Sequence, residues 1–514
     1  MEPVYITTPI YYVNAEPHLG HTYTTVVADT LARYHRQRGR RTYLVTGTDE
    51  HGDKVALAAA AAGVTPQEHA NRTSRLFRDT WDECGIQYDY FIRTTDRHHI
   101  EVVQEILQQV HDAGDIYFGS YGGLYCTGCE RFYTEKELVD GKCPDHLTVP
   151  AYVDEQNYFF RMSKYQGRLV DELTARPDLI LPERYRNEVL AMLRDEALGD
   201  LCISRPKSRL TWGIELPFDA NYVTYVWFDA LINYVSALRL KGKEVFDELW
   251  PHAQHLIGKD ILKPHGIFWP TMLMSVGLPL FKGLRVHGFW TRGESKMSKS
   301  LGNVIRPLEM KKRFGMDSFR YFLLREMAFG QDATFSTDAL ITRVNADLAN
   351  NLGNLISRTL AMQKRYFDGE VQELTTPWST EDQELMAAHE RALEEVPAHV
   401  EQLAFHRALE STWRAIDRAN KYVVETAPFR LMKDDATKRR AGAILHHLLE
   451  GLYVTAFLLE PFLPETAARI LTLLGLPADS KVDEAWQWGN AVPAGHRVGP
   501  PEALFPRIEN EENA

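Results

Sequence analysis

Two short motifs in this 514-residue chain combine residue types that could hold a phosphate group. The first, PHLGH at residues 17–21, stands between a short apolar run and a long helical pattern. At such a junction the backbone N–H groups and the helix dipole favour an anion, and a glycine lets a nucleotide approach the backbone. His18 and His21 could donate hydrogen bonds to phosphate oxygens. The alternatives are a metal site, for which no third ligand lies nearby in the sequence, and two histidines satisfied within a turn.

The second motif is KMSKS at residues 296–300, inside the stretch TRGESKMSKSLGN. Lys296 and Lys299 are three residues apart on a predicted loop, and two such cations suit the charge that a triphosphate develops in a transition state. The alternative is an exposed basic loop. Because the two motifs occur in this order and flank a sheet that is split in the sequence, together they favour a triphosphate site.

Four further residues have the spacing of zinc ligands. Cys126 and Cys129 are separated by two residues, thirteen residues follow, and Cys143 and His146 are again separated by two. Each pair can hold one edge of a tetrahedral Zn²⁺ ion, and four protein ligands leave no open position for catalysis. The spacing predicts one structural zinc ion. The alternative is a disulfide with spare ligands, and it fits poorly with a chain that is expected to be cytoplasmic.

The elements that position these residues follow from the apolar pattern. Residues 3–8 and 42–47 resemble strands, and residues 20–38 between them have helical spacing, which is typical of a βαβ unit in a parallel sheet. The alternation returns at 255–260, 267–276 and 284–289, so the sheet is split by an insertion over about 117–213. From about residue 340 strand patterns end, and long helical patterns predict an all-α bundle.

Composition narrows the class of protein. Hydrophobic residues make up 44% and charged residues 25% of the chain, which is ordinary for a soluble protein. The formal net charge of −12 argues against indiscriminate nucleic-acid binding, although basic stretches at 33–41, 311–325 and 438–440 allow a specific partner. The apolar stretches 267–281 and 443–463 are interrupted by Pro, Gly or charge, so we expect buried helices and no membrane span. With no signal-peptide pattern, a cytoplasmic location is expected.

The two phosphate motifs are similar to the two signatures of class I aminoacyl-tRNA synthetases. Four longer stretches resemble the methionyl-tRNA synthetase family: TTPIYYVNAEPHLGH (7–21), TGTDEHG (46–52), YVWFDALINYVSA (225–237) and GKDILKPHGIFWP (258–270). The resemblance runs from residue 3 to about 500. It implies a Rossmann-type catalytic domain that activates L-methionine with ATP, releases pyrophosphate, and transfers methionine to the 3′-terminal adenosine of tRNA(Met).

The resemblance also implies roles for individual residues. His18, His21, Lys296 and Lys299, with a Mg²⁺ ion on ATP, would stabilise charge in the activation step. The ATP and adenylate site would comprise His18, Gly20, His21, Gly258, Asp260 and Lys299. Asp49 would hold the α-amino group of methionine. An apolar, polarisable thioether suits aromatic walls, and the side-chain pocket would consist of Tyr12, Trp227, Ala230, Tyr234, Ile261 and His265.

The same resemblance divides the chain into five parts. We expect the first half of the catalytic domain at 1–116, a zinc-bearing insertion at 117–213, the second half at 214–290, a stem-contact region with KMSKS at 291–345, and an anticodon-binding bundle with a tail at 346–514.

Asn354 and Arg358 lie one helical turn apart and match anticodon-contacting positions. Phe429 stands where the family usually has tryptophan, so it could stack on a base less extensively or be a core residue. Because the chain ends in an acidic tail, we expect a monomer.

Three rival functions stay open at this point. One is a synthetase for another small amino acid, with cysteine the sharpest case, although a closed zinc site could not reach a substrate thiolate. The insertion is too small for the editing domain of the isoleucine, valine and leucine enzymes. A second rival is an HxGH nucleotidyltransferase, which would not need a long helical region. The third is a zinc protein that binds tRNA without catalysis.

Overall fold

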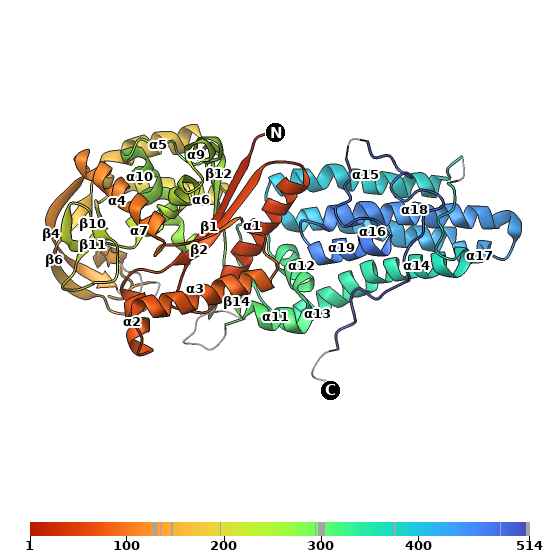
Figure 1. The fold of residues 1–514 in the computed structure, drawn as a ribbon, viewed down its shortest axis with the longest axis horizontal. Coiled ribbons are helices and arrows are strands. Elements are labelled where there is room, and N and C mark those ends of the chain that lie inside the picture. Colours follow the sequence, from red (N-terminus) through yellow and green to blue (C-terminus); the bar gives the residue numbers. More distant parts are fainter. Residues whose placement is uncertain are drawn as a thin grey trace. The chain divides into compact units, whose positions relative to one another are not determined.

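The computed structural model describes residues 1–126, 131–133, 135–144, 147–195, 197–292, 295–296, 304–374, 377–483 and 485–509. The chain divides into two compact units, Met1–Gly288 and Phe289–Ala514 (Figure 1). The first is a mixed α/β unit and the second is mainly helical, as the sequence predicts.

The first unit is built on a six-stranded sheet with the order β3-β2-β1-β12-β13-β7. Each pair of neighbouring strands in it is parallel. Its strands are β1 (Val4–Tyr12), β2 (Thr42–Asp49), β3 (Tyr90–Arg93), β7 (Ile180–Leu181), β12 (Ala253–Gly258) and β13 (Gly283–His287). The predicted βαβ unit at the N-terminus is confirmed, and β12 and β13 confirm the return of the sheet after the insertion.

Helices connect these strands and cover the sheet (Figure 1). Their bounds are α1 (Leu19–Gln37), α2 (Asp53–Ala61), α3 (Pro66–Glu83), α4 (Arg97–Asp112), α5 (Gln166–Ala175), α6 (Glu183–Asp195), α7 (Trp227–Ala230), α8 (Asn233–Arg239), α9 (Lys243–Leu249) and α10 (Trp269–Ser275), with a π-helix at Pro264–Phe268 before α10. Local signals start several of them. Helix α3 begins with a capping box formed by Thr65 and Glu68, and Pro66 occupies its first turn.

Two small antiparallel sheets lie between α4 and β12 in the sequence. One has the order β5-β4-β6-β8 and the other β10-β11-β9. Their strands are β4 (Ile116–Cys126), β5 (Arg131–Tyr133), β6 (Ala151–Phe160), β8 (Leu201–Cys202), β9 (Ser204–Pro206), β10 (Glu215–Leu216) and β11 (Asp219–Thr224). Strand β7, which also falls within residues 117–213, pairs with β13 at the edge of the parallel sheet. The expected insertion therefore supplies one strand to the main sheet.

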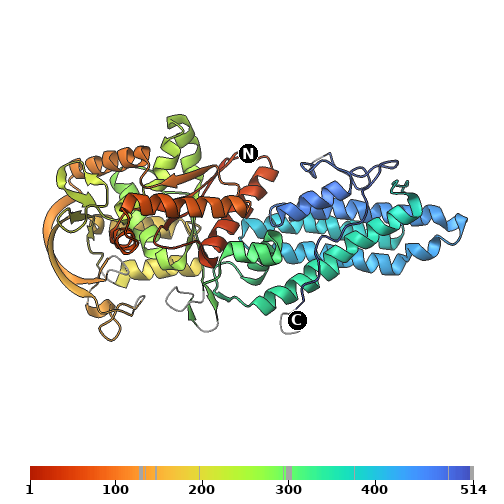
Figure 2. The same cartoon turned by 60° about the horizontal axis from the view of Figure 1, so that its bottom comes forward.

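The second unit begins with a small sheet of order β15-β14-β16 and continues as helices. The strands are β14 (Trp290–Arg292), β15 (Ser295–Lys296) and β16 (Ala333–Thr334). The helices are α11 (Pro307–Phe314), α12 (Met316–Glu326), α13 (Thr337–Arg343), a π-helix at Val344–Gly353, α14 (Asn354–Phe367), α15 (Thr380–Glu401), α16 (Phe405–Thr426), α17 (Pro428–Leu431), α18 (Asp435–Leu459) and α19 (Pro464–Leu473). Figure 2 shows the long cyan and blue helices of this unit lying alongside one another.

Helix α18 forms the centre of the bundle. In the described part of the chain it is the one helix whose length and apolar character would allow it to cross a bilayer, but its apolar window is entirely buried. It carries His446, His447 and Glu450, which are buried as well. The expectation of a buried helix in this stretch is confirmed.

Candidate active site

PHLGH and the segment with Asp260, both predicted to bind the nucleotide, follow neighbouring strands of the parallel sheet. Strand β1 has β2 on one side and β12 on the other. PHLGH follows the carboxyl end of β1, and the segment with Asp260 follows that of β12. In open parallel sheets, ligands bind outside the carboxyl ends of the strands where the strand order reverses. The topology therefore brings residues about 240 positions apart to the edge where a nucleotide is expected.

PHLGH forms the start of helix α1. His18 is the N-cap, and its Nδ1 accepts a hydrogen bond of 3.1 Å from the backbone N–H of Gly20. In the neutral ring Nε2 therefore carries the proton and can act as a donor. The ring of His21 stacks on that of His18 with centroids 3.7 Å apart. The first turn of α1 contains no acidic residue, so the helix end retains its preference for an anion.

The end of β12 leaves little space beside its backbone. A Cβ atom on Gly258 would lie 2.6 Å from Oδ1 of Asp260, so a larger residue at position 258 would displace that carboxylate. Asp260 is exposed, whereas Gly258 is buried. Both predicted residues therefore stand at the carboxyl end of a central strand, which fits contact with a ribose.

His287, at the end of β13, is a neighbour of this site that the sequence did not single out. Its ring lies close to the same position, since a Cβ on Gly258 would be 3.6 Å from its Cε1. Burial lowers the pKa of His287, so the ring is neutral. Its Nδ1–H donates to the carbonyl of Gly288 (2.7 Å), and Nε2 lies 2.7 Å from the Thr24 hydroxyl on α1. His287 thus links β13 to the helix that begins with PHLGH.

Tyr12 and Asp49 are partners across two strands. They are the last residues of β1 and β2 and are paired in the sheet register. Asp49 is only 3% exposed, and the backbone N–H of Val13 donates to its carbonyl at 3.2 Å. Its carboxylate is therefore placed in a largely desolvated position, where an ammonium group would be attracted strongly.

Hydrogen bonds link the buried side chains of Tyr234 and His265 to the backbone of Ile261, which is partly buried. Nδ1 of His265 lies 2.9 Å from the carbonyl of Ile261, and Nε2 lies 2.7 Å from the Tyr234 hydroxyl. Burial lowers the pKa of His265 to about 4, so the ring is neutral. Nδ1–H then donates to Ile261, and the Tyr234 hydroxyl donates to Nε2. Burial raises the pKa of Tyr234, and the charge of nearby Asp49 raises it further.

Trp227 and Ala230 are the first and last residues of the short helix α7. Trp227 is half-buried and, like Tyr12, packs against a cluster that contains Tyr125 and Tyr225. Ala230 is buried, and its carbonyl accepts a hydrogen bond from Asn233 at 2.6 Å. The residues of the predicted side-chain pocket thus come from the end of β1, helix α7, the start of α8 and the segment after β12.

Two of the four predicted zinc ligands, Cys126 and Cys143, lie within the described residues. Cys126 and Cys143 are buried in one small cluster with Tyr133, and Sγ of Cys143 lies 3.4 Å from the Tyr133 hydroxyl. Cys129 and His146 lie outside the described residues, as does Lys299. Among the described residues, no group of three or more His, Cys, Asp or Glu could hold a metal. Two buried cysteines in one cluster fit a structural site. Lys296 is located by its backbone on β15.

The three predicted anticodon residues are exposed. Asn354 opens α14, and its side chain donates to the carbonyl of Asn350 at 3.0 Å. Arg358 lies one turn further along the same face. Phe429 is 44% exposed on α17, with the Arg430 guanidinium 5.9 Å from the ring centroid. Its ring is therefore not a core residue and is accessible for stacking.

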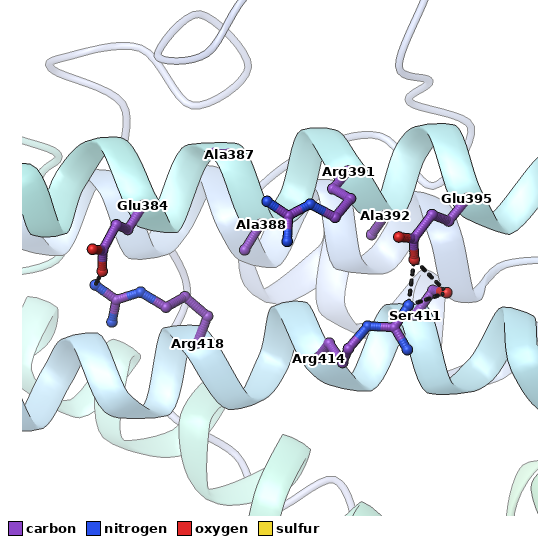
Figure 3. Close-up of a pocket in the computed structure, with 9 residues that line it drawn as sticks. All are labelled: Glu384, Ala387, Ala388, Arg391, Ala392, Glu395, Ser411, Arg414 and Arg418. Carbon is purple, nitrogen blue, oxygen red and sulfur yellow. Dashed lines mark hydrogen bonds and ion pairs between the residues drawn. The ribbon is translucent and has the colours of Figure 1, made fainter.

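The helical bundle also has a cavity of about 320 Å³ between α15 and α16 (Figure 3). Arg418 pairs with Glu384 at 2.9 Å at one end, and Arg414 pairs with Glu395 at the other. Arg391 lies between the two pairs in Figure 3. None of the residues that line this cavity is a predicted binding residue, and four of its five charges are paired with one another.

The chain matches two family models and is similar to many known proteins. The model described as tRNA synthetases class I (M) matches residues 4–149 and 146–360. The model described as anticodon binding domain of methionyl tRNA ligase matches residues 374–514. The methionine–tRNA ligase of Caldanaerobacter subterraneus is 45% identical over 512 residues, which cover 99% of this chain and 79% of that protein. The enzyme of the same name from Clostridium perfringens is 45% identical with the same coverage.

Solved structures agree with this similarity. Mycobacterium tuberculosis methionyl-tRNA synthetase in complex with methionyl-adenylate has 40% sequence identity and a TM-score of 0.92, covering 99% of this chain and all of that one. The apo form of the same enzyme has 37% identity and a TM-score of 0.85, with 99% of both chains covered. The likeness spans both units and is not confined to the catalytic half.

Proposed function

The chain belongs to the methionine–tRNA ligases of the class I tRNA synthetase family, and on this premise we propose how its residues carry out the reaction. It activates L-methionine with ATP to form methionyl-adenylate and pyrophosphate, and then transfers methionine to tRNA(Met). The observation that supports this most strongly is the position of PHLGH, Asp49 and Gly258 at the carboxyl ends of adjacent strands β1, β2 and β12. This is the edge at which parallel sheets bind nucleotides.

The ATP step depends on positioning and charge. A carboxylate oxygen of methionine attacks the α-phosphorus of ATP, a new P–O bond forms, and pyrophosphate leaves. His18 and His21, at the start of α1, donate to phosphate oxygens, and Gly20 lets the nucleotide approach. Gly258 and Asp260 hold the ribose. Lys296 and Lys299 supply positive charge to the leaving pyrophosphate, and Mg²⁺ enters bound to ATP.

Methionine is recognised at both of its ends. The carboxylate of Asp49 pairs with the α-ammonium group, and its burial strengthens that attraction. The thioether lies among Tyr12, Trp227, Ala230, Tyr234, Ile261 and His265. Because His265 is neutral and accepts a hydrogen bond from the Tyr234 hydroxyl, these two groups present no charge to an apolar side chain. Such a pocket favours methionine over cysteine, whose thiol is smaller and more polar.

The helical unit recognises the tRNA. Unpaired anticodon bases are read through hydrogen bonds at their edges and through stacking on aromatic rings. Asn354 and Arg358 are exposed on one face of α14 and can provide the hydrogen bonds. Phe429 offers an exposed ring for stacking, with a smaller area than tryptophan and no indole N–H.

One structural zinc ion is part of the proposal. Cys126, Cys129, Cys143 and His146 have the spacing of a closed tetrahedral site. The common burial of Cys126 and Cys143 supports it. When bound, the metal holds together a segment whose own apolar cluster is small. We include a cytoplasmic location and a monomeric state in the proposal, the latter to be tested by light scattering.

The proposed function is tested by aminoacylation of tRNA(Met) with radiolabelled methionine. The wild-type chain is expected to form methionyl-tRNA in the presence of ATP and Mg²⁺. His21→Ala should slow both adenylate formation and charging by about 10²-fold or more, as expected when a donor to developing charge is lost. Absence of charging by folded, zinc-loaded wild-type protein would contradict the proposal.

A further inference from the structure

A buried carboxylate in the first unit lies between two histidines that come from distant parts of the chain. Asp229, on α7, is only 1% exposed. Its Oδ2 lies 2.7 Å from Nδ1 of His51, and its Oδ1 lies 2.8 Å from Nε2 of His99. On the far side, Nδ1 of His99 lies 2.8 Å from the hydroxyl of Ser236 on α8. Each oxygen of this carboxylate thus binds a different segment of the chain.

The first of these segments carries the residue proposed to bind the methionine ammonium group. His51 is two residues after Asp49 in the loop between β2 and α2. Between them, the fully buried carboxylate of Glu50 accepts two hydrogen bonds from Arg93, of 2.7 and 2.8 Å, and a third from the Thr95 hydroxyl. The two residues that follow Asp49 in this loop are therefore fixed independently, Glu50 to the β3 side and His51 to Asp229.

The second segment carries part of the proposed side-chain pocket. Asp229 lies between Trp227 and Ala230 in α7, a helix of only four residues. A helix this short has no stability of its own and must be held by tertiary contacts. The bonds from Asp229 to His51 and His99 are such contacts, since they join α7 to the β2–α2 loop and to α4.

The charge on Asp229 makes both contacts strong. Burial raises the pKa of its carboxyl group, but the charges and hydrogen bonds of His51 and His99 outweigh this effect and lower the pKa to about 2. The carboxylate is ionised at neutral pH, so Nδ1 of His51 and Nε2 of His99 are the donors. Hydrogen bonds to a buried carboxylate are short and difficult to replace.

We propose that Asp229 is a positioning residue for methionine: through His51 and His99 it fixes the distance between the Asp49 carboxylate and the Trp227–Ala230 wall of the pocket. This inference rests on the proposed function, because it assigns both ends of methionine to these two segments. Asp229 does not touch the substrate. Its role is to keep the ammonium site and the thioether site in register, so that one amino acid of fixed length fits both.

The test compares four variants by ATP–pyrophosphate exchange, with KM measured separately for methionine and ATP. Asp229→Asn introduces an amide N–H₂ group opposite a histidine donor, and His51→Ala removes one contact. His51→Asn retains a donor near the position of Nδ1 and is the conservative rescue. Asp115→Asn is the matched control, because Asp115 is also a 1% exposed aspartate of this unit, bound to Lys164 at 2.6 Å, Tyr165 and Ser275.

The expected result separates positioning from a general loss of stability. Asp229→Asn and His51→Ala should raise the KM for methionine by about tenfold or more, and the KM for ATP by less than about twofold. His51→Asn should restore most of the affinity for methionine. Asp115→Asn should lower the melting temperature without changing the KM for methionine. If Asp229→Asn does not fold, the pair His51→Ala and His51→Asn decides, because both leave Asp229 in place.

Two outcomes would overturn the inference. An unchanged KM for methionine in folded His51→Ala, beside an active wild type, would overturn the positioning role alone. Equal increases of the KM for methionine and for ATP, shared by Asp115→Asn, would show a structural effect and would overturn it as well. Absence of methionine-dependent exchange by the wild type would instead overturn the proposed function, and with it the assignment on which the positioning role depends.

Discussion

Replacing Asp49 by asparagine should separate recognition of the ammonium group from recognition of the thioether. The substitution keeps the shape of the side chain and removes its charge. Asp49 is 3% exposed at the end of β2, and its segment is fixed by Glu50 and His51. The position of residue 49 should therefore be retained, and the loss should fall on its interaction with the substrate.

The magnitude follows from this burial. Removing one partner of a buried, hydrogen-bonded charge pair costs about 2–5 kcal/mol. At 25 °C this corresponds to a decrease in kcat/KM for methionine of roughly 30-fold to 4,000-fold. An exposed pair would cost about 1 kcal/mol or less, which is about fivefold. The predicted range therefore depends directly on the desolvation of Asp49.

The assay is ATP–pyrophosphate exchange with methionine as substrate and with the analogue that lacks the α-amino group as competitive inhibitor. Asp49→Asn should decrease kcat/KM for methionine strongly. It should change the inhibition constant of the analogue by less than about threefold, since that ligand has no ammonium group to interact with residue 49. Equal effects on methionine and the analogue would refute the assignment. So would a decrease of less than about fivefold for methionine in a protein whose melting temperature is unchanged.

Three other predictions concern the helical unit and the zinc site. Asp382 is fully buried with Arg440 at 2.6 and 2.7 Å, and although burial raises its pKa, hydrogen bonds chiefly from Arg440 lower it from 3.8 to about 2. Its contribution to stability is present above pH 3.8 and is lost as the pH falls towards 2, so Asp382→Asn should reduce the unfolding free energy at pH 7 and flatten its acid dependence in denaturant titrations. Elemental analysis should find one zinc ion per chain, and the double variant Cys126→Ser, Cys143→Ser should lose it and melt at lower temperature; a wild type without zinc would contradict the site. Phe429→Ala should raise the KM for tRNA(Met) by the equivalent of about 1–3 kcal/mol in charging assays, while tRNA-independent exchange stays unchanged.

Apolar periodicity in the sequence predicted the longer helices and strands. The βαβ unit of β1, α1 and β2, the return of the sheet at β12 and the buried helix α18 follow from apolar periodicity over several turns or alternations. Strand β7 could not be predicted in this way, because two residues contain no period. It exists through its pairing with β13, which lies about a hundred residues further along the chain.

In the site, too, residues that are contiguous in the sequence could be predicted and contacts between distant residues could not. His18, Gly20 and His21 are contiguous, so their motif was visible, and the family resemblance supplied Asp49 and the pocket residues. Asp229 is 178 residues from His51 and 130 from His99 in the sequence. No sequence motif or periodicity connects residues this far apart. His287 was visible only as part of a strand. Such contacts arise when the chain folds back on itself, and a single sequence gives no signal for them.

The central claim is activation of methionine, and ATP–pyrophosphate exchange without tRNA tests it most directly. Purified, zinc-loaded protein should be assayed with methionine, cysteine, leucine, isoleucine and valine as the added amino acid. Exchange with methionine should be at least about a hundredfold above that with each of the others, because the pocket must bind both an ammonium group and a thioether of one length. Comparable exchange with any other amino acid, or none with methionine, would contradict it.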